Sequence, residues 1–378
     1  MNVHDYLDCP DSEQVLSYRD KRFVTRHVSF INTTTDIDSL KYDIGVLGVP
    51  DDLNLNSFES AKQIREQLYG LAPLSNSFRI IDLGNIKSGH TFNDTCFALS
   101  EIVSLMRQND IVILLIGGDS KFNLGSFLTF DRSQEPLNMV AIDSVINPDK
   151  VPLMAAGNMK LINTDESISL FNFINIGYQT YFVEKEFIDS LNDSFYEIYR
   201  LGYVRANLQE MEPCLRDANL ISFSLNSIRH SDAPGTLFSS PNGLSGEEAC
   251  QLSFYAGHSN RIKSFGLYDL ACGNDHHSNT AKLAAQILWY FLEGSCSSIF
   301  EEPDITPENF VKFLIHLDST NQNIAFFKSN LTNRWWMEIN YPESNRNILL
   351  SCSESDYELA CHQDIPDRWW RTFQRLSL

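Results

Sequence analysis

Short apolar runs alternate along this chain with segments in which apolar residues recur at helical spacing. The clearest run is residues 111–116, IVILLI, which stops at two glycines. Such runs are typical of strands buried on both faces, and their alternation with helices predicts a parallel sheet covered on both sides. The other expected strands are 42–50, 79–83, 137–142, 171–177, 220–225 and 261–267. The expected helices are 60–69, 95–108, 120–130, 184–191, 246–257 and 278–293.

The pattern divides the chain into three parts. Residues 1–41 form a polar lead segment without periodicity, 42–296 form the α/β domain, and 297–378 form a C-terminal extension. The extension contains four of the five tryptophans, in two adjacent pairs. Tryptophan at this density favours an extension packed on the main domain. The alternative is an exposed aromatic surface that binds a partner.

Composition excludes several classes of function. The chain has 378 residues, 43% hydrophobic content, a net charge of −20 and a pI near 4.8. Such a surface repels phosphate backbones, so nucleic acid is not expected as a partner. No stretch approaches the ~18 apolar residues of a membrane span, and the amino terminus lacks the pattern of a signal peptide. We therefore predict a cytoplasmic protein without membrane insertion, whose eight scattered cysteines are reduced thiols.

Polar segments follow several predicted strands, where parallel sheets place ligand-handling residues. These segments are GGDS (117–120), DSVIN (143–147), SFSLN (222–226) and YDL (268–270). Their order, with GVP (48–50), DLGN (82–85), NIG (175–177) and DAPG (232–235), resembles the ureohydrolase superfamily of arginase, agmatinase and formimidoylglutamase. The likeness is greatest to a bacterial formimidoylglutamase-like branch. It implies a three-layer α/β/α fold with two manganese ions at the strand ends, which activate a water to attack a guanidinium or formimino carbon.

The resemblance also implies six metal-ligand positions, and most of them have changed. The family motifs are Gly-Gly-Asp-His, Asp-Ala-His-x-Asp and Asp-x-Asp. The corresponding positions here are Ser120, Asp143, Val145, Asn147, Ser224 and Asn226. A later family glutamate corresponds to Asp269. One carboxylate with neutral oxygens cannot hold a binuclear manganese site, because two divalent cations need several carboxylates and imidazoles.

The sequence therefore predicts a pseudoenzyme, a ureohydrolase-fold protein without a cofactor that acts as a binding or assembly component. Its partner would be another protein or a second copy of the chain. The alternative is a metal-dependent hydrolase of C–N bonds in formimino or guanidino compounds, with manganese as cofactor. We expect metal analysis to distinguish the two.

Two further groups of residues are candidates for binding. A possible pocket is formed by residues at and beyond the strand ends, namely Asp119, Arg229, His230, Asp232 and Asp269. Arg229 and Asp232 could bind a small zwitterion, or they could form an ordinary ion pair within the loop. His276 and His277 follow Asp275, which could indicate a metal site or a solvated loop.

Overall fold

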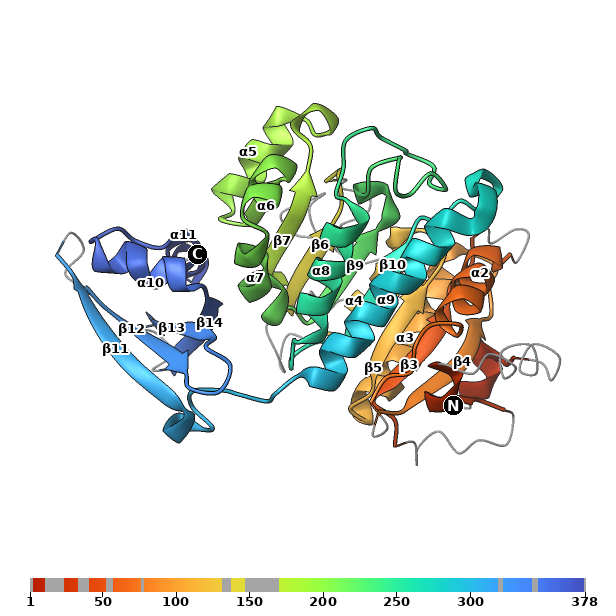
Figure 1. Ribbon diagram of the computed structural model, residues 1–378, viewed down its shortest axis with the longest axis horizontal. Helices are drawn as coiled ribbons and strands as arrows, with labels where there is room; N and C mark the ends of the chain where they lie inside the picture. The colour runs from red at the N-terminus through yellow and green to blue at the C-terminus, as the bar shows by residue number, and fades with distance from the viewer. Residues whose placement is uncertain are drawn as a thin grey trace.

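A computed structural model of the chain describes residues 3–10, 24–32, 41–51, 57–75, 78–130, 137–146, 170–318, 322–341 and 346–376. The described residues form a large α/β/α domain followed by a smaller C-terminal unit (Figure 1). Within these residues, no helix has the length and apolar character needed to cross a membrane.

The main sheet has the strand order β1-β4-β3-β5-β10-β9-β6-β7-β8, and β2 also pairs with β4. All of its pairs are parallel except β1 with β4. The predicted parallel sheet is therefore confirmed. The strands are β1 (Leu7–Asp8), β2 (Val28–Phe30), β3 (Ile44–Gly48), β4 (Ile80–Ile86), β5 (Val112–Ile116), β6 (Leu137–Ile142), β7 (Leu170–Tyr178), β8 (Glu197–Arg200), β9 (Leu220–Ser224) and β10 (Ser264–Tyr268).

Helices cover both faces of this sheet, which completes the three layers. The helices are α2 (Glu59–Leu68), α3 (Phe92–Gln108), α4 (Asn123–Phe127), α5 (Lys185–Asp193), α6 (Leu201–Ala206), α7 (Glu212–Arg216), α8 (Gly246–Gly257) and α9 (Asn279–Ser297). Helices α2, α8 and α9 pack on one face, and α8 and α9 lie in front of the sheet in Figure 1. Helices α3 and α4 pack on the opposite face.

The sequence pattern explains this division between the faces. Alternate residues of a strand point to opposite sides of the sheet, so Leu114 and Ile116 of β5 join the core under α2, α8 and α9. Ile113 and Leu115 join the core under α3. Because both sides of β5 are buried, its sequence is continuously apolar rather than alternating.

Some elements differ from the expectation. The helix expected over 120–130 is a 3-10 turn at Ser120–Phe122 followed by the short α4. Strand β8 was not predicted, because its first residue is a glutamate. Glu197 is nevertheless buried, since cationic side chains from the C-terminal unit contact it. A hydrophobic pattern does not reveal a strand whose buried position is charged.

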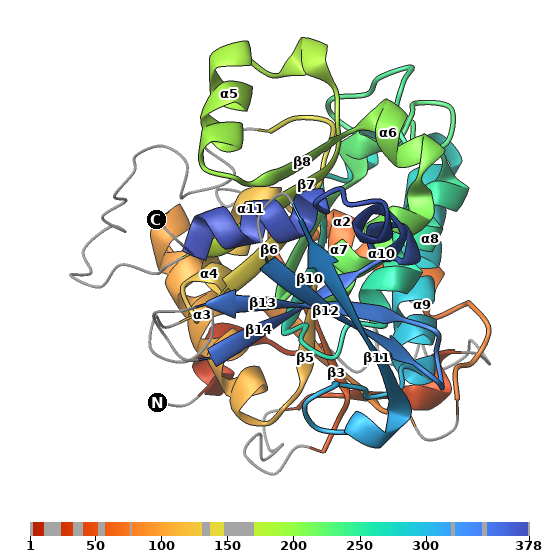
Figure 2. The same ribbon diagram turned by 90° about the vertical axis from the view of Figure 1, so that its left-hand side faces the viewer.

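The C-terminal unit has its own sheet rather than extending the main one. Its antiparallel strands are β11 (Phe310–Leu317), β12 (Gln322–Ser329), β13 (Trp335–Tyr341) and β14 (Arg346–Cys352), followed by helices α10 (Glu354–Cys361) and α11 (Asp367–Leu376). Figure 2, viewed from this side, shows the four strands in front of the main domain. Trp335 and Trp369 are buried in the core of this unit, with Phe326 and Met337. Trp370 is 41% exposed.

Buried charges connect this unit to the main domain. Arg368 of α11 donates to Glu197 of β8 at 2.9 Å and to Asp217 at 3.4 Å. Ser351 of β14 donates to Asp217 through its backbone N–H at 3.0 Å and its hydroxyl at 2.6 Å. The guanidinium of Arg216 lies 4.2 Å from the centre of the Trp336 ring. Polar contacts and the ring of Trp336 therefore link the two units, whereas Trp335 and Trp369 pack within the C-terminal unit itself.

Candidate functional site

The sheet brings the four candidate segments to one edge. Strands β5, β10, β9 and β6 are consecutive neighbours, and their carboxyl ends carry Ser120, Asp269, Ser224 and Asp143 respectively. The register pairs Tyr268 with Ser224 across β10 and β9. Since neighbouring strands lie about 4.8 Å apart, residues from four distant parts of the sequence share one small region.

A tight turn after β5 begins this region. Gly117 and Gly118 have φ angles of +84° and +63°, which favour glycine. A Cβ atom on Gly118 would lie 2.6 Å from the carbonyl oxygen of Pro50. The N–H of Gly118 donates to the carboxylate of Asp51 at 3.2 Å, and the hydroxyl of Ser60 donates to the same carboxylate. Sequence reasoning missed Asp51 and Ser60 because they belong to no recognised motif, although Asp51 directly follows GVP at 48–50.

A hydrogen bond between two side chains lies at the centre of the site. The hydroxyl of Ser224 donates to Oδ2 of Asp269 at 2.6 Å, and both residues are buried. The Ser224 oxygen also accepts from the N–H of Asn226 at 3.2 Å. Asp269 has a φ of +71°, an unfavourable backbone conformation for a residue with a side chain. Packing and hydrogen bonds offset this strain, so they hold the carboxylate against β9.

Asn226, a replaced position, and Asp143, the one that keeps its carboxylate, also make internal contacts. Oδ1 of Asn226 accepts from the N–H of Phe238 at 3.2 Å. Oδ1 of Asp143 accepts from the N–H of Val145 at 3.2 Å. Each of these bonds links two protein groups, and each occupies one acceptor site of the oxygen concerned.

Ser120 and Asn147 differ from the other ligand positions. Ser120 is buried, and its hydroxyl has no hydrogen-bond partner among the described residues. Asn147 lies outside the described residues, as does the rest of 147–169. The sequence of that segment contains Asp149, Asp165 and Glu166 but no histidine or cysteine. It therefore supplies no imidazole to the site.

The donors that the described residues supply differ from the carboxylates and imidazoles of a binuclear manganese centre. Across the described ranges, no group of three or more His, Cys, Asp and Glu side chains could hold a metal ion. Among the described residues, the donors at the strand ends are hydroxyls, an amide and the carboxylates of Asp143 and Asp269, together with Asp119, which accepts the N–H of Lys121. Two adjacent divalent cations need more negative charge than this, and imidazoles that fix their geometry.

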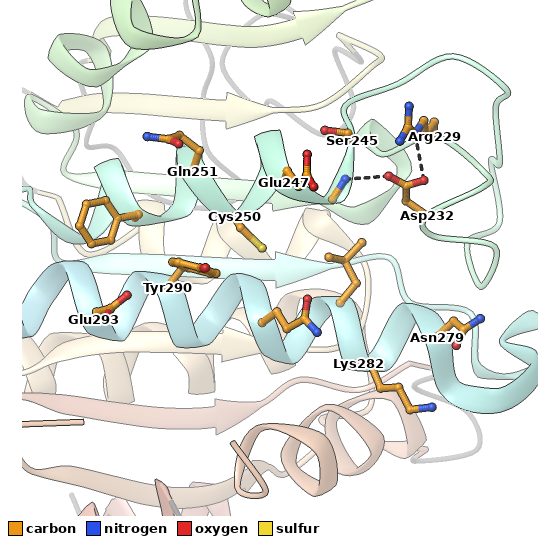
Figure 3. A pocket seen from close by; sticks show the side chains of 14 residues that line it. Arg229, Asp232, Ser245, Glu247, Cys250, Gln251, Asn279, Lys282, Tyr290 and Glu293 are labelled. Atoms are coloured by element: carbon orange, nitrogen blue, oxygen red, sulfur yellow. Dashed lines mark hydrogen bonds and ion pairs between the residues drawn. The ribbon is translucent and has the colours of Figure 1, made fainter. Parts of the chain in front are cut away.

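The pocket residues predicted from sequence separate into two places. Asp119 and Asp269 lie at the strand ends, where Asp119 accepts from the N–H of Lys121 at 2.8 Å and begins the 3-10 turn. Arg229 and Asp232 lie together at the end of a groove between α8 and α9 (Figure 3). His230 is exposed on the same loop. The structure therefore does not bring all five residues into one pocket.

The Arg229–Asp232 pair supports a helix end. Nε of Arg229 donates to Oδ1 of Asp232 at 2.9 Å, and the N–H of Gly246 at the start of α8 donates to Oδ2 at 2.8 Å. Burial alone would raise the pKa of Asp232, but these hydrogen bonds outweigh it and lower the pKa to about 2. A carboxylate held in this way stabilises the amino terminus of α8.

The histidine pair has a similar structural context. Asp275 accepts from the N–H groups of Thr280 and Ala281 at 2.9 Å each, and so it occupies the start of α9. His276 and His277 are exposed in the preceding turn, with His277 at a φ of +64°. In the described part of the chain, these three residues do not form a metal-binding group.

The groove between α8 and α9 was not predicted from the sequence. It has a volume of about 870 Å³ and runs along both helices. Cys250 and Leu283 are nearly buried within it, and Tyr290 is 39% exposed at its side. The spacing of apolar residues along a helix indicates which face is buried, but it does not show whether two packed helices form a groove at the surface.

Comparison with known proteins agrees with this architecture. The sequence matches the arginase family over residues 42–293. The structure is similar to a Trypanosoma cruzi formiminoglutamase with Mn²⁺, at 16% identity and a TM-score of 0.57, covering 70% of this chain and 98% of that one. It is also similar to formimidoylglutamase from Bacillus subtilis, at 16% identity and a TM-score of 0.60, covering 75% and 94%. A hypothetical agmatinase from Burkholderia thailandensis matches at 20% identity and a TM-score of 0.55, covering 70% and 88%. No curated protein matches the sequence.

Proposed function

The chain belongs to the arginase family. From the side chains at its strand ends, we propose that it is a pseudoenzyme that acts as a binding or assembly component. The observation that carries this proposal is the hydrogen bond of 2.6 Å between Ser224 and Asp269. By the family resemblance, Ser224 stands where a metal-binding carboxylate is expected. Its neutral hydroxyl instead donates a hydrogen bond to the neighbouring carboxylate, so this position supplies none of the negative charge that two divalent cations require.

The neighbouring replacements support the same proposal. Val145 has no donor atom, and the amide of Asn226 already accepts a backbone N–H. Neutral groups at adjacent strand ends also avoid the mutual repulsion that clustered carboxylates would have without a metal. The replacements therefore preserve the fold at this edge while removing the charges that hold manganese, and we propose that the protein needs no cofactor.

The second candidate is a manganese-dependent hydrolase of C–N bonds in formimino or guanidino compounds. Two observations favour it: the family match, and the structural likeness to a formiminoglutamase with Mn²⁺. This candidate requires ligands beyond those that the described residues supply.

Metal analysis combined with an activity assay tests the proposal. We expect the purified protein, incubated with Mn²⁺ and then desalted, to retain less than one equivalent of metal and to release no urea, ammonia or formamide from guanidino and formimino substrates. A matched variant carries Ser120→His, Val145→His, Asn147→Asp, Ser224→Asp and Asn226→Asp, and we expect it to gain manganese affinity. Stoichiometric manganese with turnover in the unmodified protein would refute the proposal.

The remaining properties follow from charge and composition. We propose that the partner is a protein rather than a nucleic acid, because a net charge of −20 opposes binding to phosphate backbones. A cytoplasmic location stays a prediction. Co-purification from native cells would identify the partner, and a partner recovered in a fixed stoichiometry is the expected result.

A further inference from the structure

Strand β11 forms one outer edge of the four-stranded sheet in the C-terminal unit. It pairs with β12 along its whole length, from Phe310 with Ser329 to Leu317 with Gln322, and with no other strand of the described residues. Figure 1 shows β11 at the margin of the unit, with no labelled element beyond it. One side of this strand is therefore open.

The main-chain groups on the open side follow from the hydrogen bonds at the start of the strand. The N–H of Asn330 donates to the carbonyl oxygen of Asn309 at 2.8 Å, so these two residues face each other across the ladder. Successive residues of an antiparallel strand alternate between facing the neighbouring strand and facing away from it. The N–H and C=O groups of Phe310, Lys312 and Leu314 therefore point away from β12. Within the described part of the chain, no hydrogen-bond partner meets them there.

The far end of the strand shows what such groups bind. The side-chain amide of Gln363 donates to the carbonyl oxygen of His316 at 3.0 Å and accepts from the N–H of Asp318 at 2.9 Å. An added strand would make the same two hydrogen bonds at this place. Gln363 therefore closes the edge at its far end, and the open segment runs from residue 310 to residue 314.

The side chains beside the open segment do not protect it. Unpaired edge strands are usually protected by proline, a bulge or an outward-pointing charge, because an open apolar edge otherwise aggregates. Strand β11 has a continuous register without a bulge, and its sequence FVKFLIHL contains no proline. The ammonium of Lys312 lies 4.9 Å from the centre of the Phe327 ring, back over its own sheet. Val311 and Leu314, on opposite faces, are 42% and 64% exposed. The edge is therefore suited to pairing with another strand.

The charges around the open segment favour a basic partner. Glu308 precedes it and is exposed, and the side chain of Asp318 after it is 85% exposed, with His316 at 3.8 Å. Lys312 within the segment lies 3.9 Å from Glu338, so its charge is balanced by its own sheet. The whole chain carries a net charge of −20, which attracts a basic segment and repels an acidic one.

A second copy of this chain fits the edge poorly. A symmetric antiparallel pair of β11 strands centred on the open segment would place Lys312 of each copy opposite Lys312 of the other, and like charges at directly opposite positions are destabilising. The same pair would bring residues 306–308 of one copy against residues 316–318 of the other, where Gln363 already lies. The strand that covers this edge is therefore better supplied by a different protein.

We propose that the open segment of β11 binds an extended segment of another protein, which adds to the sheet as a further antiparallel strand. The bound segment has no proline, carries apolar side chains at alternate positions and has a basic residue at each end. Main-chain hydrogen bonds give the affinity, and the terminal charges select the partner. This inference deepens the proposed function and rests on it, because it names the surface and the class of partner for a chain that acts by binding a protein.

Two synthetic peptides with the same side chains test the proposal. The first is Ac-Lys-Val-Thr-Val-Thr-Val-Lys-NH2, and the second is identical but N-methylated at every residue between the two lysines. We expect the first to bind the full chain with one-to-one stoichiometry in a calorimetric titration. The second should bind at least tenfold more weakly, because methylation removes the N–H groups and keeps the side chains and charges. Equal binding of both peptides, or binding of neither, would overturn the proposal.

Variants of the chain locate the site. Leu314→Pro removes an N–H that points away from β12, which an edge strand tolerates, and should weaken binding of the first peptide at least tenfold. Leu314→Ala keeps that N–H and should weaken binding less. The double variant Glu308→Lys with Asp318→Lys should bind a peptide with glutamate ends more tightly than the one with lysine ends. Glu186→Lys with Asp193→Lys on α5 changes the net charge equally and should not reverse the preference.

Separate measurements keep the outcomes distinct. Circular dichroism melts check that each variant is folded, and binding that is insensitive to Leu314→Pro in a folded variant would overturn the proposal. Sedimentation velocity tests the other occupant, since a dimer of the parent chain that Leu314→Pro dissociates would show that β11 pairs with a second copy instead. Metal content and turnover are measured independently, so failure of peptide binding is distinguishable from failure of the proposed pseudoenzyme.

Discussion

Replacing Arg368 with alanine should weaken the attachment of the C-terminal unit to the main domain. Arg368 is buried and donates to Glu197 at 2.9 Å, to Asp217 at 3.4 Å and to the carbonyl oxygen of Ser351. The substitution leaves two buried carboxylates without their main cation. Removing one partner of a buried ion pair costs about 3–5 kcal/mol.

Other contacts reduce this cost. Arg375 remains 3.8 Å from Glu197, Asn172 and Tyr199 still donate to that carboxylate, and Ser351 still donates to Asp217. We therefore expect a loss near the lower limit, about 3 kcal/mol, which is roughly a hundredfold in the equilibrium between attached and detached units. This is a large part of the about 5–15 kcal/mol that typically stabilises a folded protein.

Tryptophan fluorescence during urea unfolding measures this effect. Four of the five tryptophans lie in the C-terminal unit, so the fluorescence mainly reports on that unit, while circular dichroism reports on the whole chain. In Arg368→Ala, the fluorescence transition should occur at lower urea than the circular dichroism transition. The control is Arg205→Ala, which removes a partly exposed pair with Glu248 and should cost less than about 1 kcal/mol.

The effect of pH gives a second measurement of the same contact. Burial alone would raise the pKa of Glu197, but Arg368 and Arg375 outweigh it and lower the pKa below its usual value. A carboxylate with a lowered pKa in the folded state contributes stability above its unfolded pKa and loses it as the pH falls through the folded value. The difference between the parent chain and Arg368→Ala should therefore shrink in acid. If the fluorescence and circular dichroism transitions of Arg368→Ala coincide at neutral pH, and the free energy of unfolding falls by less than about 1 kcal/mol, then Arg368 does not hold the two units together.

Three further changes test other parts of the structure. Ser224→Ala should lower the free energy of unfolding by about 1–3 kcal/mol, because the buried Asp269 loses a hydrogen-bond donor; an unchanged melting temperature would contradict this contact. Gly118→Ala should cost about 1–3 kcal/mol in the same assay, since its φ is +63° and its Cβ would lie 2.6 Å from a carbonyl oxygen; a neutral result would contradict the strained turn. Burial, together with nearby arginines, lowers the pKa of His258 from 6.5 to about 4, so the unfolded chain binds a proton first and stability should fall as the pH drops between these values. His258→Gln should flatten that fall, and an NMR titration with a midpoint near 6.5 would contradict the lowered pKa.

Much of the main domain could be predicted from the sequence because its strands are buried on both faces. Continuous apolar runs such as 111–116 give a strong pattern, and helix 246–257 was predicted with the bounds that the structure has. The prediction was less complete where buried positions are charged, as in β8. The β-sheet of the C-terminal unit was missed for a related reason, since its strands mix apolar, aromatic and charged residues at the surface of a small unit.

The candidate site shows the same limit in more detail. Motif order placed Ser120, Asp143, Ser224 and Asp269 at strand ends, and the sheet brings these strand ends together. Motif order also grouped Arg229 and Asp232 with Asp269, whereas the structure places the first two at the start of α8. Residues close in sequence to a strand end can turn away from it, because the loop that follows the strand is free to pack against a helix.

The sequence by itself determined the class of fold, the family resemblance and the chemical identity of the side chains at the strand ends. These depend on residue type and on local periodicity, which the linear order contains. Only the tertiary structure decided that Ser224 donates to Asp269, that Arg368 lies between Glu197 and Asp217, and that α8 and α9 leave a groove between them. The two contacts join residues more than twenty positions apart in the sequence, and the groove depends on how two helices pack. Packing of distant segments decides such features, and a local sequence pattern does not contain them.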